Sequence, residues 1–281
     1  MRTIGELHRR GASLLADSES SLLDAKVLLI HAAGLTEEIF HTRPEAVIPG
    51  RAAGRFLGLV RRRRRGVPLA YLTGIREFWS LPLEVRPGVL IPRPETELLV
   101  ETVLALSARP DQVIADIGTG CGAIALALAS ERPQPRIIAT DISRRALRTA
   151  RRNAGRLGSA NIAFLRGDLF APLAKRGLRE CCDVVVSNPP YLSRANWEGL
   201  APGVRDHEPA GALLAGPSGL EVIGRIVAEA PAFLRPGGRL VLEIGAGQSA
   251  PILRLFGPGW TEVACRPDLA GIPRVVTARR I

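Results

Sequence analysis

The sequence predicts an α/β fold, in which a mostly parallel seven-stranded sheet covered by helices follows a small all-α domain and a β-hairpin. Short apolar runs of strand type alternate with helical patterns through the second half of the chain, and parallel strands require such crossover connections. The first 75 residues or so instead show helical periodicity. The two final strand-like runs are separated only by residues 267–273, which suits a terminal antiparallel hairpin.

Length and composition favour one large domain or two smaller ones. The chain has 281 residues, of which 46% are hydrophobic and 23% charged, close to the average for globular proteins. No apolar run approaches the roughly 18 residues of a membrane span, and the first residues lack a secretory signal, so we expect a cytoplasmic protein. The four cysteines show neither zinc-ligand nor disulfide spacing, and we expect no metal.

The formal net charge of +11 would attract nucleic acid. However, 36 of the 38 basic residues are arginine, a bias that a GC-rich coding sequence produces by itself. We therefore expect any nucleic-acid contact to be secondary, with no membrane partner and a monomeric protein.

Three helices are expected in the N-terminal part, over residues 4–15, 21–34 and 51–65. Ser21 is the predicted N-cap of the second helix and Gly34 its end. The third ends in five arginines, residues 61–65, before Gly66 and Pro68 break the chain. Cations favour the negative end of a helix, so we favour a solvated helix end over a dedicated binding patch.

A β-hairpin is expected to join the helical domain to the sheet. Residues 77–85 alternate as a strand does, and Pro87–Gly88 forms a turn. Pro94 then begins a helix, because its ring suits the first helical position. The predicted boundaries are residues 1–73 for the helical domain, 74–92 for the linker and 93–281 for the α/β domain.

The α/β domain is expected to alternate strands and helices. The carboxyl ends of its parallel strands would meet at one edge, where open sheets bind ligands. The predicted strands cover residues 112–117, 136–140, 162–166, 183–187, 238–244, 260–266 and 274–278, and the predicted helices cover residues 123–130, 143–157 and 219–234.

A glycine-rich turn, Asp-Ile-Gly-Thr-Gly-Cys-Gly at residues 116–122, lies between the first strand and its helix. Glycines let the backbone approach a ligand, and the helix N-terminus would offer free N–H groups to an anion. The spacing Gly-x-Gly-x-Gly after an acid differs from the dinucleotide fingerprint and resembles the S-adenosylmethionine site of Rossmann-like methyltransferases. The resemblance assigns the loop to that cofactor: Gly118, Thr119, Gly120, Cys121 and Gly122.

Two more carboxylates follow the next two strands. Asp141 would accept hydrogen bonds from both ribose hydroxyls, or would alternatively cap the following helix. Asp168 lies where methyltransferases of this class hold the adenine amine, with Leu169 against the ring; the alternative is an ordinary turn acid. The glycine loop and these acids are expected to converge on one crevice.

Asn188-Pro189-Pro190-Tyr191 follows the fourth strand and indicates the reaction. The two prolines stiffen the loop, so the Asn188 side chain and the Pro189 carbonyl are expected to be held in place. Both present oxygen acceptors, and accepting both protons of an amide or aryl amine draws its nitrogen toward an attacking geometry. We expect these four residues to bind the substrate and catalyse by positioning, with Tyr191 packed on the planar substrate group and Asn188 also touching the cofactor.

Together these residues resemble the release factor glutamine methyltransferases, the HemK or PrmC family. The resemblance implies a helical substrate-recognition domain, a hairpin linker and a class I S-adenosylmethionine-dependent methyltransferase domain. It implies methyl transfer to the side-chain amide nitrogen of the glutamine in the Gly-Gly-Gln motif of class-I peptide-chain release factors, with S-adenosyl-L-homocysteine as product. It covers nearly the full chain, at residues 68–74, 76–79, 90–97, 116–122, 187–191, 208–209 and 242–245.

Other acceptors share the Asn-Pro-Pro-Tyr loop, among them nucleic-acid exocyclic amines and a ribosomal-protein glutamine. The N-terminal domain and residues 91–97 favour release factors over both. Intact cofactor and catalytic motifs argue against a non-catalytic binding module.

Two residues depart from the family pattern. Cys121 stands where serine or threonine is more frequent, and we expect its thiol to be packed. His207 stands before Glu208–Pro209, where an aromatic is common, so we expect a different packing there. Arg93 and Glu95 would line the crevice or begin a helix, and Glu243 has no assigned role.

Overall fold

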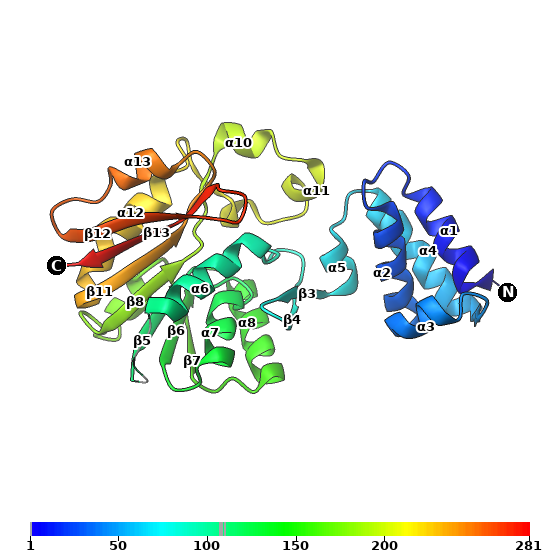
Figure 1. Ribbon diagram of the computed structural model, residues 1–281, viewed down its shortest axis with the longest axis horizontal. Coiled ribbons are helices and arrows are strands. Elements are labelled where there is room, and N and C mark those ends of the chain that lie inside the picture. The colour runs from blue at the N-terminus through cyan, green and yellow to red at the C-terminus, as the bar shows by residue number, and fades with distance from the viewer. Residues whose placement is uncertain (1, 107–108, 110) are drawn as a thin grey trace. The chain divides into compact units, whose positions relative to one another are not determined.

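The computed structural model describes residues 2–106, 109 and 111–281 and divides them into two compact units. The first holds residues 2–75 and 202–207, and the second holds residues 76–201 and 208–281 (Figure 1). Within the described residues, no helix combines the length and apolarity needed to cross a membrane.

The first unit is helical. Thr3 and Glu6 begin the first helix with a capping box, in which each side chain bonds the other's backbone N–H. Gly11 lets two helices approach closely, because a Cβ there would lie 2.4 Å from the Phe56 ring. The elements are β1 (Arg2–Thr3), α1 (Ile4–Leu14), α2 (Ser21–Ala33), α3 (Glu37–Thr42), β2 (Val47–Ile48), α4 (Gly50–Arg64), α5 (Leu69–Thr73) and α11 (Pro202–Arg205).

The expected N-cap of α2 is wrong by one residue. Ser20 occupies that position without a side-chain cap bond, whereas Gly34 ends the helix in the left-handed conformation, as predicted. The short helices α3 and α5 were not expected from the sequence, because five or six residues carry too little periodicity.

The arginine run at the end of α4 is a solvated helix end with one exception. Four of the five side chains are exposed. Arg63 instead bonds the buried Asp24 carboxylate on α2 through Nε at 2.7 Å, so it links two helices of the unit.

The second unit contains the predicted seven-stranded sheet, in the order β12-β13-β11-β8-β5-β6-β7. Five strands are parallel, and β13 pairs antiparallel with both β11 and β12, which confirms the terminal hairpin. The strands are β5 (Val113–Ile117), β6 (Arg136–Asp141), β7 (Ile162–Arg166), β8 (Cys182–Ser187), β11 (Leu234–Glu243), β12 (Trp260–Pro267) and β13 (Pro273–Arg280).

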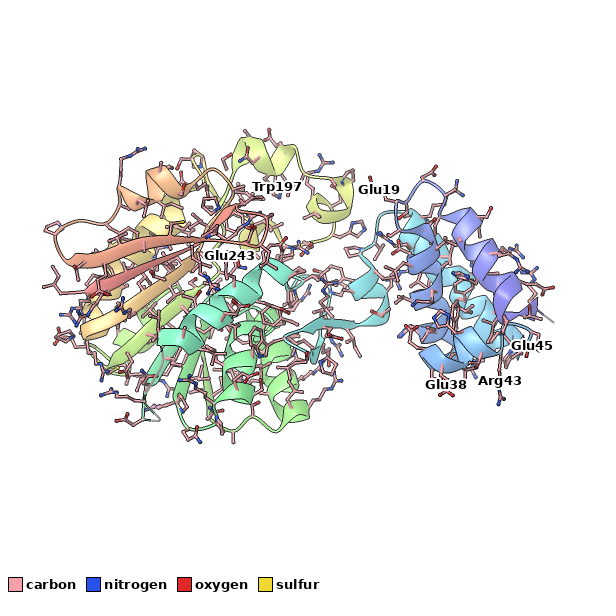
Figure 2. All side chains as sticks on the ribbon, in the orientation of Figure 1. Glu19, Glu38, Arg43, Glu45, Trp197 and Glu243 are labelled. Carbon is pink, nitrogen blue, oxygen red and sulfur yellow. The ribbon has the colours of Figure 1, made fainter. Side chains whose placement is uncertain are left out.

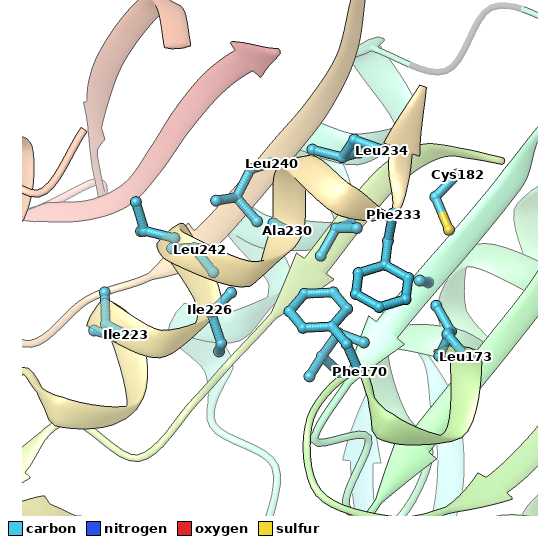
Figure 3. Packing of buried hydrophobic residues seen from close by; sticks show 14 of the residues in the cluster. Phe170, Leu173, Cys182, Ile223, Ile226, Ala230, Phe233, Leu234, Leu240 and Leu242 are labelled. Atoms are coloured by element: carbon cyan, nitrogen blue, oxygen red, sulfur yellow. The ribbon is translucent and has the colours of Figure 1, made fainter. Parts of the chain in front are cut away.

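Helices cover both faces of this sheet (Figure 1). On one face lie α6 (Glu97–Leu106), α7 (Ala123–Glu131) and α8 (Arg144–Leu157), and on the other lie α12 (Glu221–Glu229) and α13 (Ser249–Leu253). The short helix α9 (Ala171–Ala174) shares the hydrophobic core of α12 and α13. The core on the second face includes Phe170 stacked on Phe233, with ring centroids 4.8 Å apart (Figure 3). The remaining elements are β3 (Ile75–Phe78), β4 (Leu81–Glu84), η1 (Pro94–Thr96), β9 (Leu192–Ser193), α10 (Arg194–Glu198), η2 (Ala210–Ala212), β10 (Leu214–Gly216) and η3 (Ala230–Ala232).

Two local expectations need correction. The β3–β4 hairpin reverses at Trp79 and Ser80, both at positive φ, inside the run that resembles a single strand; the turn at Pro87–Gly88 is separate. The helix predicted to reach residue 234 ends as α12 at Glu229, because Pro231 lacks the N–H that an α-helix needs. Strand β11 then begins at Leu234.

Candidate functional site

A cavity of about 340 Å³ lies in the second unit, at the carboxyl ends of parallel strands. The neighbouring strands β5 and β8 both end at this edge of the sheet. They form its topological switch point, because β6 and β7 lie on one side of β5 whereas β8 lies on the other. Seven of the predicted site residues line the cavity: Gly118, Gly120, Asp141, Asp168, Leu169, Asn188 and Pro190.

The glycine-rich loop after β5 is held by hydrogen bonds to the neighbouring strand β6. The N–H groups of Gly118 and Thr119 both donate to the Thr140 carbonyl, at 2.9 and 2.8 Å. A Cβ added at Gly118 or Gly120 would meet no atom within 4 Å, whereas one at Gly122 would lie 3.2 Å from the Ala150 side chain on α8. The first two glycines therefore face the cavity, and the third allows close packing of helices.

The other loop side chains point into the protein. The Thr119 hydroxyl donates to the buried Asp116 carboxylate. Burial raises the pKa of Asp116 to about 7, although this hydrogen bond lowers it. Cys121 is buried, as expected, and burial raises the pKa of its thiol to about 12. Asp116 thus supports the loop from beneath.

Asp141 connects the loop to α8. Its Oδ2 accepts from Gly120 N at 2.9 Å and its Oδ1 from Ser143 N at 2.7 Å. Ser143, not Asp141, caps α8, because the Ser143 hydroxyl accepts from Ala146 N. Burial raises the pKa of Asp141, while both backbone bonds lower it. The loop therefore offers fewer free N–H groups than the sequence suggests.

The third strand contributes Asp168 and Leu169. Asp168 is half-exposed, and its Oδ2 accepts from the Arg225 guanidinium at 2.7 Å. Leu169 has a φ of 40°, a backbone conformation that residues other than glycine seldom adopt. Its carbonyl accepts from the Thr140 hydroxyl at 3.2 Å, which helps to hold the strained residue at the cavity wall.

Asn188 lies between this cavity and a second hollow of about 20 Å³. Pro190 also lines both, and the smaller one is further lined by Arg93, Pro189 and Tyr191. The Asn188 Nδ2 donates to the Thr96 hydroxyl at 2.9 Å. Since the nitrogen end of the amide is held by Thr96, its oxygen is the end left to accept from a ligand.

The loop carrying Tyr191 is clamped by Gln248. Its Nε2 donates to the Tyr191 carbonyl at 2.8 Å, and its Oε1 accepts from Gly245 N at 3.0 Å. A Cβ added at Gly245 would lie 3.0 Å from the Tyr191 ring. Burial raises the pKa of Tyr191 to about 12, so its hydroxyl is neutral.

Glu208 joins two further walls of the site. Its buried carboxylate accepts from the Arg93 guanidinium and from Ile91 N, the latter at 3.1 Å. Leu90 beside Ile91 and Pro209 beside Glu208 both line the larger cavity.

Pro94 begins the 3₁₀ helix η1, as predicted. His207 belongs to the helical unit, where its ring lies 3.5 Å from the position of a Cβ at Gly66.

Known proteins match both parts of the chain. Residues 6–74 match the family model described as PrmC N-terminal domain, and residues 94–200 match the methyltransferase small domain. A release factor glutamine methyltransferase of Burkholderia pseudomallei is 45% identical over 95% of both chains, and one of Moorella thermoacetica is 44% identical over 99% of this chain and 98% of that one. The chain belongs to the release factor glutamine methyltransferase family.

The family identification and the fold agree. A methyltransferase of Pyrococcus furiosus has a TM-score of 0.52 at 21% identity, covering 71% of this chain and 88% of that one, a likeness of fold alone. As a release factor glutamine methyltransferase family member, the protein is a methyltransferase.

Several residues of this family member's site were not expected to act there. Thr96, Gln248 and Glu208 contact the site loops from 57 to 115 residues away in the chain. Thr96 and Glu208 each lie within a segment that resembles the family, but neither segment shows which side chain a residue contacts.

Proposed function

We propose that the protein transfers the methyl group of S-adenosyl-L-methionine to the side-chain amide nitrogen (N5) of the glutamine in the Gly-Gly-Gln motif of class-I release factors. The observation that carries the proposal is Asn188, which lines both hollows and has its amide oxygen left to accept. The relatives named for release factor glutamine methylation support the acceptor.

The cavity suits the cofactor. Gly118 and Gly120 leave open space where a side chain would stand. Each Asp141 oxygen accepts one N–H and keeps a further lone pair for a ribose hydroxyl. Asp168 and Leu169 would hold the adenine, while Thr119, Cys121 and Gly122 shape the loop. When bound, S-adenosyl-L-methionine supplies a methyl group activated by its sulfonium charge.

The chain's own residues would then orient the acceptor. The Asn188 oxygen and the Pro189 carbonyl accept the two protons of the glutamine amide, which holds its nitrogen toward the larger cavity. Pro190 stiffens the loop, and Tyr191, held through Gln248, packs on the planar amide. Such alignment can contribute about 7–11 kcal/mol to catalysis.

We propose that the helical domain, residues 1–73, recognises the release factor, with residues 74–92 as linker and residues 93–281 as the catalytic domain. Its separate core supports an independent docking role. Deleting it should raise KM for the release factor while leaving the cofactor Kd unchanged, as calorimetry would measure.

The test of the reaction uses labelled S-adenosyl-L-methionine, a matching release factor, and a copy whose Gly-Gly-Gln glutamine is changed to alanine. One added methyl on that glutamine, located by mass spectrometry and absent from the altered copy, is expected. Label on ribosomal protein or nucleic acid, with none on the release factor, would contradict the release-factor glutamine as the acceptor. The assignment as a methyltransferase would still stand.

A further inference from the structure

Glu243, the last residue of β11, is a buried carboxyl group that the proposed reaction does not use. The residue is 2% exposed, and within the described residues its Oε2 has no hydrogen-bond partner. Figure 2 shows it inside the α/β unit. Burying a carboxyl without full hydrogen bonding is costly, so its position beside the site calls for an explanation.

The groups around Glu243 come from three other elements. Burial is the largest influence on the pKa of Glu243 and raises it, whereas the nearby hydroxyls of Thr96 (η1) and Tyr191 (the loop after β8) and the charge of Arg274 on β13 lower it. The charge of Glu95 also raises it, and the net result is a pKa of about 7. The carboxyl therefore changes charge near neutral pH.

Thr96 stands between this carboxyl and the candidate catalytic amide. It is 4% exposed, and its oxygen accepts from Asn188 Nδ2 at 2.9 Å. A hydroxyl has a single proton. Because Asn188 Nδ2 is the donor toward Thr96, the hydroxyl proton of Thr96 is free to donate a hydrogen bond to Glu243. An ionised carboxylate can only accept hydrogen bonds.

We propose that Glu243 is a positioning residue that fixes, through the Thr96 hydroxyl, which end of the Asn188 amide faces the substrate. The two ends of an asparagine amide have nearly the same shape, so hydrogen-bond partners select the orientation. Ionised Glu243 accepts a hydrogen bond from the Thr96 hydroxyl, Thr96 accepts one from Asn188 Nδ2, and the amide oxygen is left for the glutamine. This role rests on the proposed function of Asn188.

Protonation of Glu243 reverses the order. The carboxylic acid donates to Thr96, whose proton is then free to turn toward Asn188, and the flipped amide presents its NH₂ to the NH₂ of the substrate. Two donors cannot bond each other. Turnover should therefore fall as pH drops through about 7, whereas the acceptor amide itself does not titrate in this range.

The kinetic test compares Thr96→Val with Thr96→Ser, and Glu243→Gln with the unaltered protein. Thr96→Val should lower kcat about tenfold, the size of one net hydrogen bond, with cofactor Kd unchanged, and Thr96→Ser should restore it. Glu243→Gln should abolish the kcat change near pH 7. Equal kcat for Thr96→Val, or the same pH dependence in Glu243→Gln, would overturn the proposal.

A second measurement does not depend on the reaction. The chain has four asparagines, so selective ¹⁵N-asparagine labelling gives four side-chain NH₂ pairs, with that of Asn188 identified by its absence in Asn188→Ala. Its shifts should titrate near pH 7 and become constant in Glu243→Gln. Unchanging shifts would refute the relay even if methylation occurs; a clear titration without methyl transfer would refute the proposed function alone.

Discussion

The two sides of the cavity differ in how far their polar groups are already bonded. On the side of β5, β6 and β7, each Asp141 oxygen accepts a backbone N–H and Asp168 pairs with Arg225. On the side of β8 and β11, the Asn188 oxygen is left to accept, and Glu243 Oε2 has no partner within the described residues.

The difference separates binding from chemistry. Groups held by backbone bonds give a preformed surface for a cofactor, which lowers the ordering that binding requires. Groups with unused bonding capacity cost stability in the free protein, but they can act on a substrate. Substitutions on the two sides should therefore affect different measured quantities.

The largest expected effect is on the acceptor side. Asn188→Ala should lower kcat by about 10²–10³-fold, the usual loss for one preplaced hydrogen-bonding group, with cofactor Kd nearly unchanged by calorimetry. Asn196→Ala, on the exposed helix α10, is the matched control. Turnover equal to that of the control would remove Asn188 from the reaction.

Asp141→Ala tests the cofactor side. Loss of charge-assisted hydrogen bonds, each worth about 1.5–3 kcal/mol, should weaken cofactor binding at least tenfold, with a smaller change in kcat at saturation. Asp141→Asn, which keeps an acceptor oxygen, should give an intermediate Kd. An unaltered Kd in the alanine variant contradicts the ribose assignment.

Gly245→Ala should disturb the acceptor side without removing a polar group. The new Cβ would meet the Tyr191 ring at 3.0 Å and Gln248 Oε1 at 2.7 Å, so kcat should fall about tenfold, comparable to losing one hydrogen bond. Gly257→Ala, where a Cβ meets nothing within 4 Å, should match the unaltered protein. Equal kcat for both variants would show that Tyr191 placement is unimportant.

The smallest effect concerns stability. The folded pKa of Glu243, about 7, lies above its usual 4.5, so its ionisation opposes folding, and stability is lost as pH rises from about 4.5 through 7. Glu243→Gln should raise the free energy of unfolding at pH 8 by about 1–3 kcal/mol and change it little at pH 4. Urea unfolding measures this; a decrease at pH 8 would mean that the charge stabilises the fold.

The sequence by itself determined the sheet, its terminal hairpin, the helical N-terminal part and the convergence of the three strand-end motifs. These features depend on local causes. Apolar periodicity marks each strand, glycine spacing marks the loop after β5, and the prolines after Asn188 restrict their own neighbourhood. Parallel strands then bring their carboxyl ends together whatever lies between them.

The tertiary structure alone decided which side chains support those motifs. Thr96 and Asn188 are 92 residues apart, and Arg93 and Glu208 are 115 apart. No local pattern connects such pairs, because the contact exists only after the sheet has formed. The hairpin turn at Trp79–Ser80 was not predicted, because neither residue is the glycine or asparagine that usually marks positive φ in a turn. In the sequence, Glu243 likewise looks like an ordinary strand-end acid. Only the folded protein buries its carboxyl near Thr96, and that burial raises its pKa.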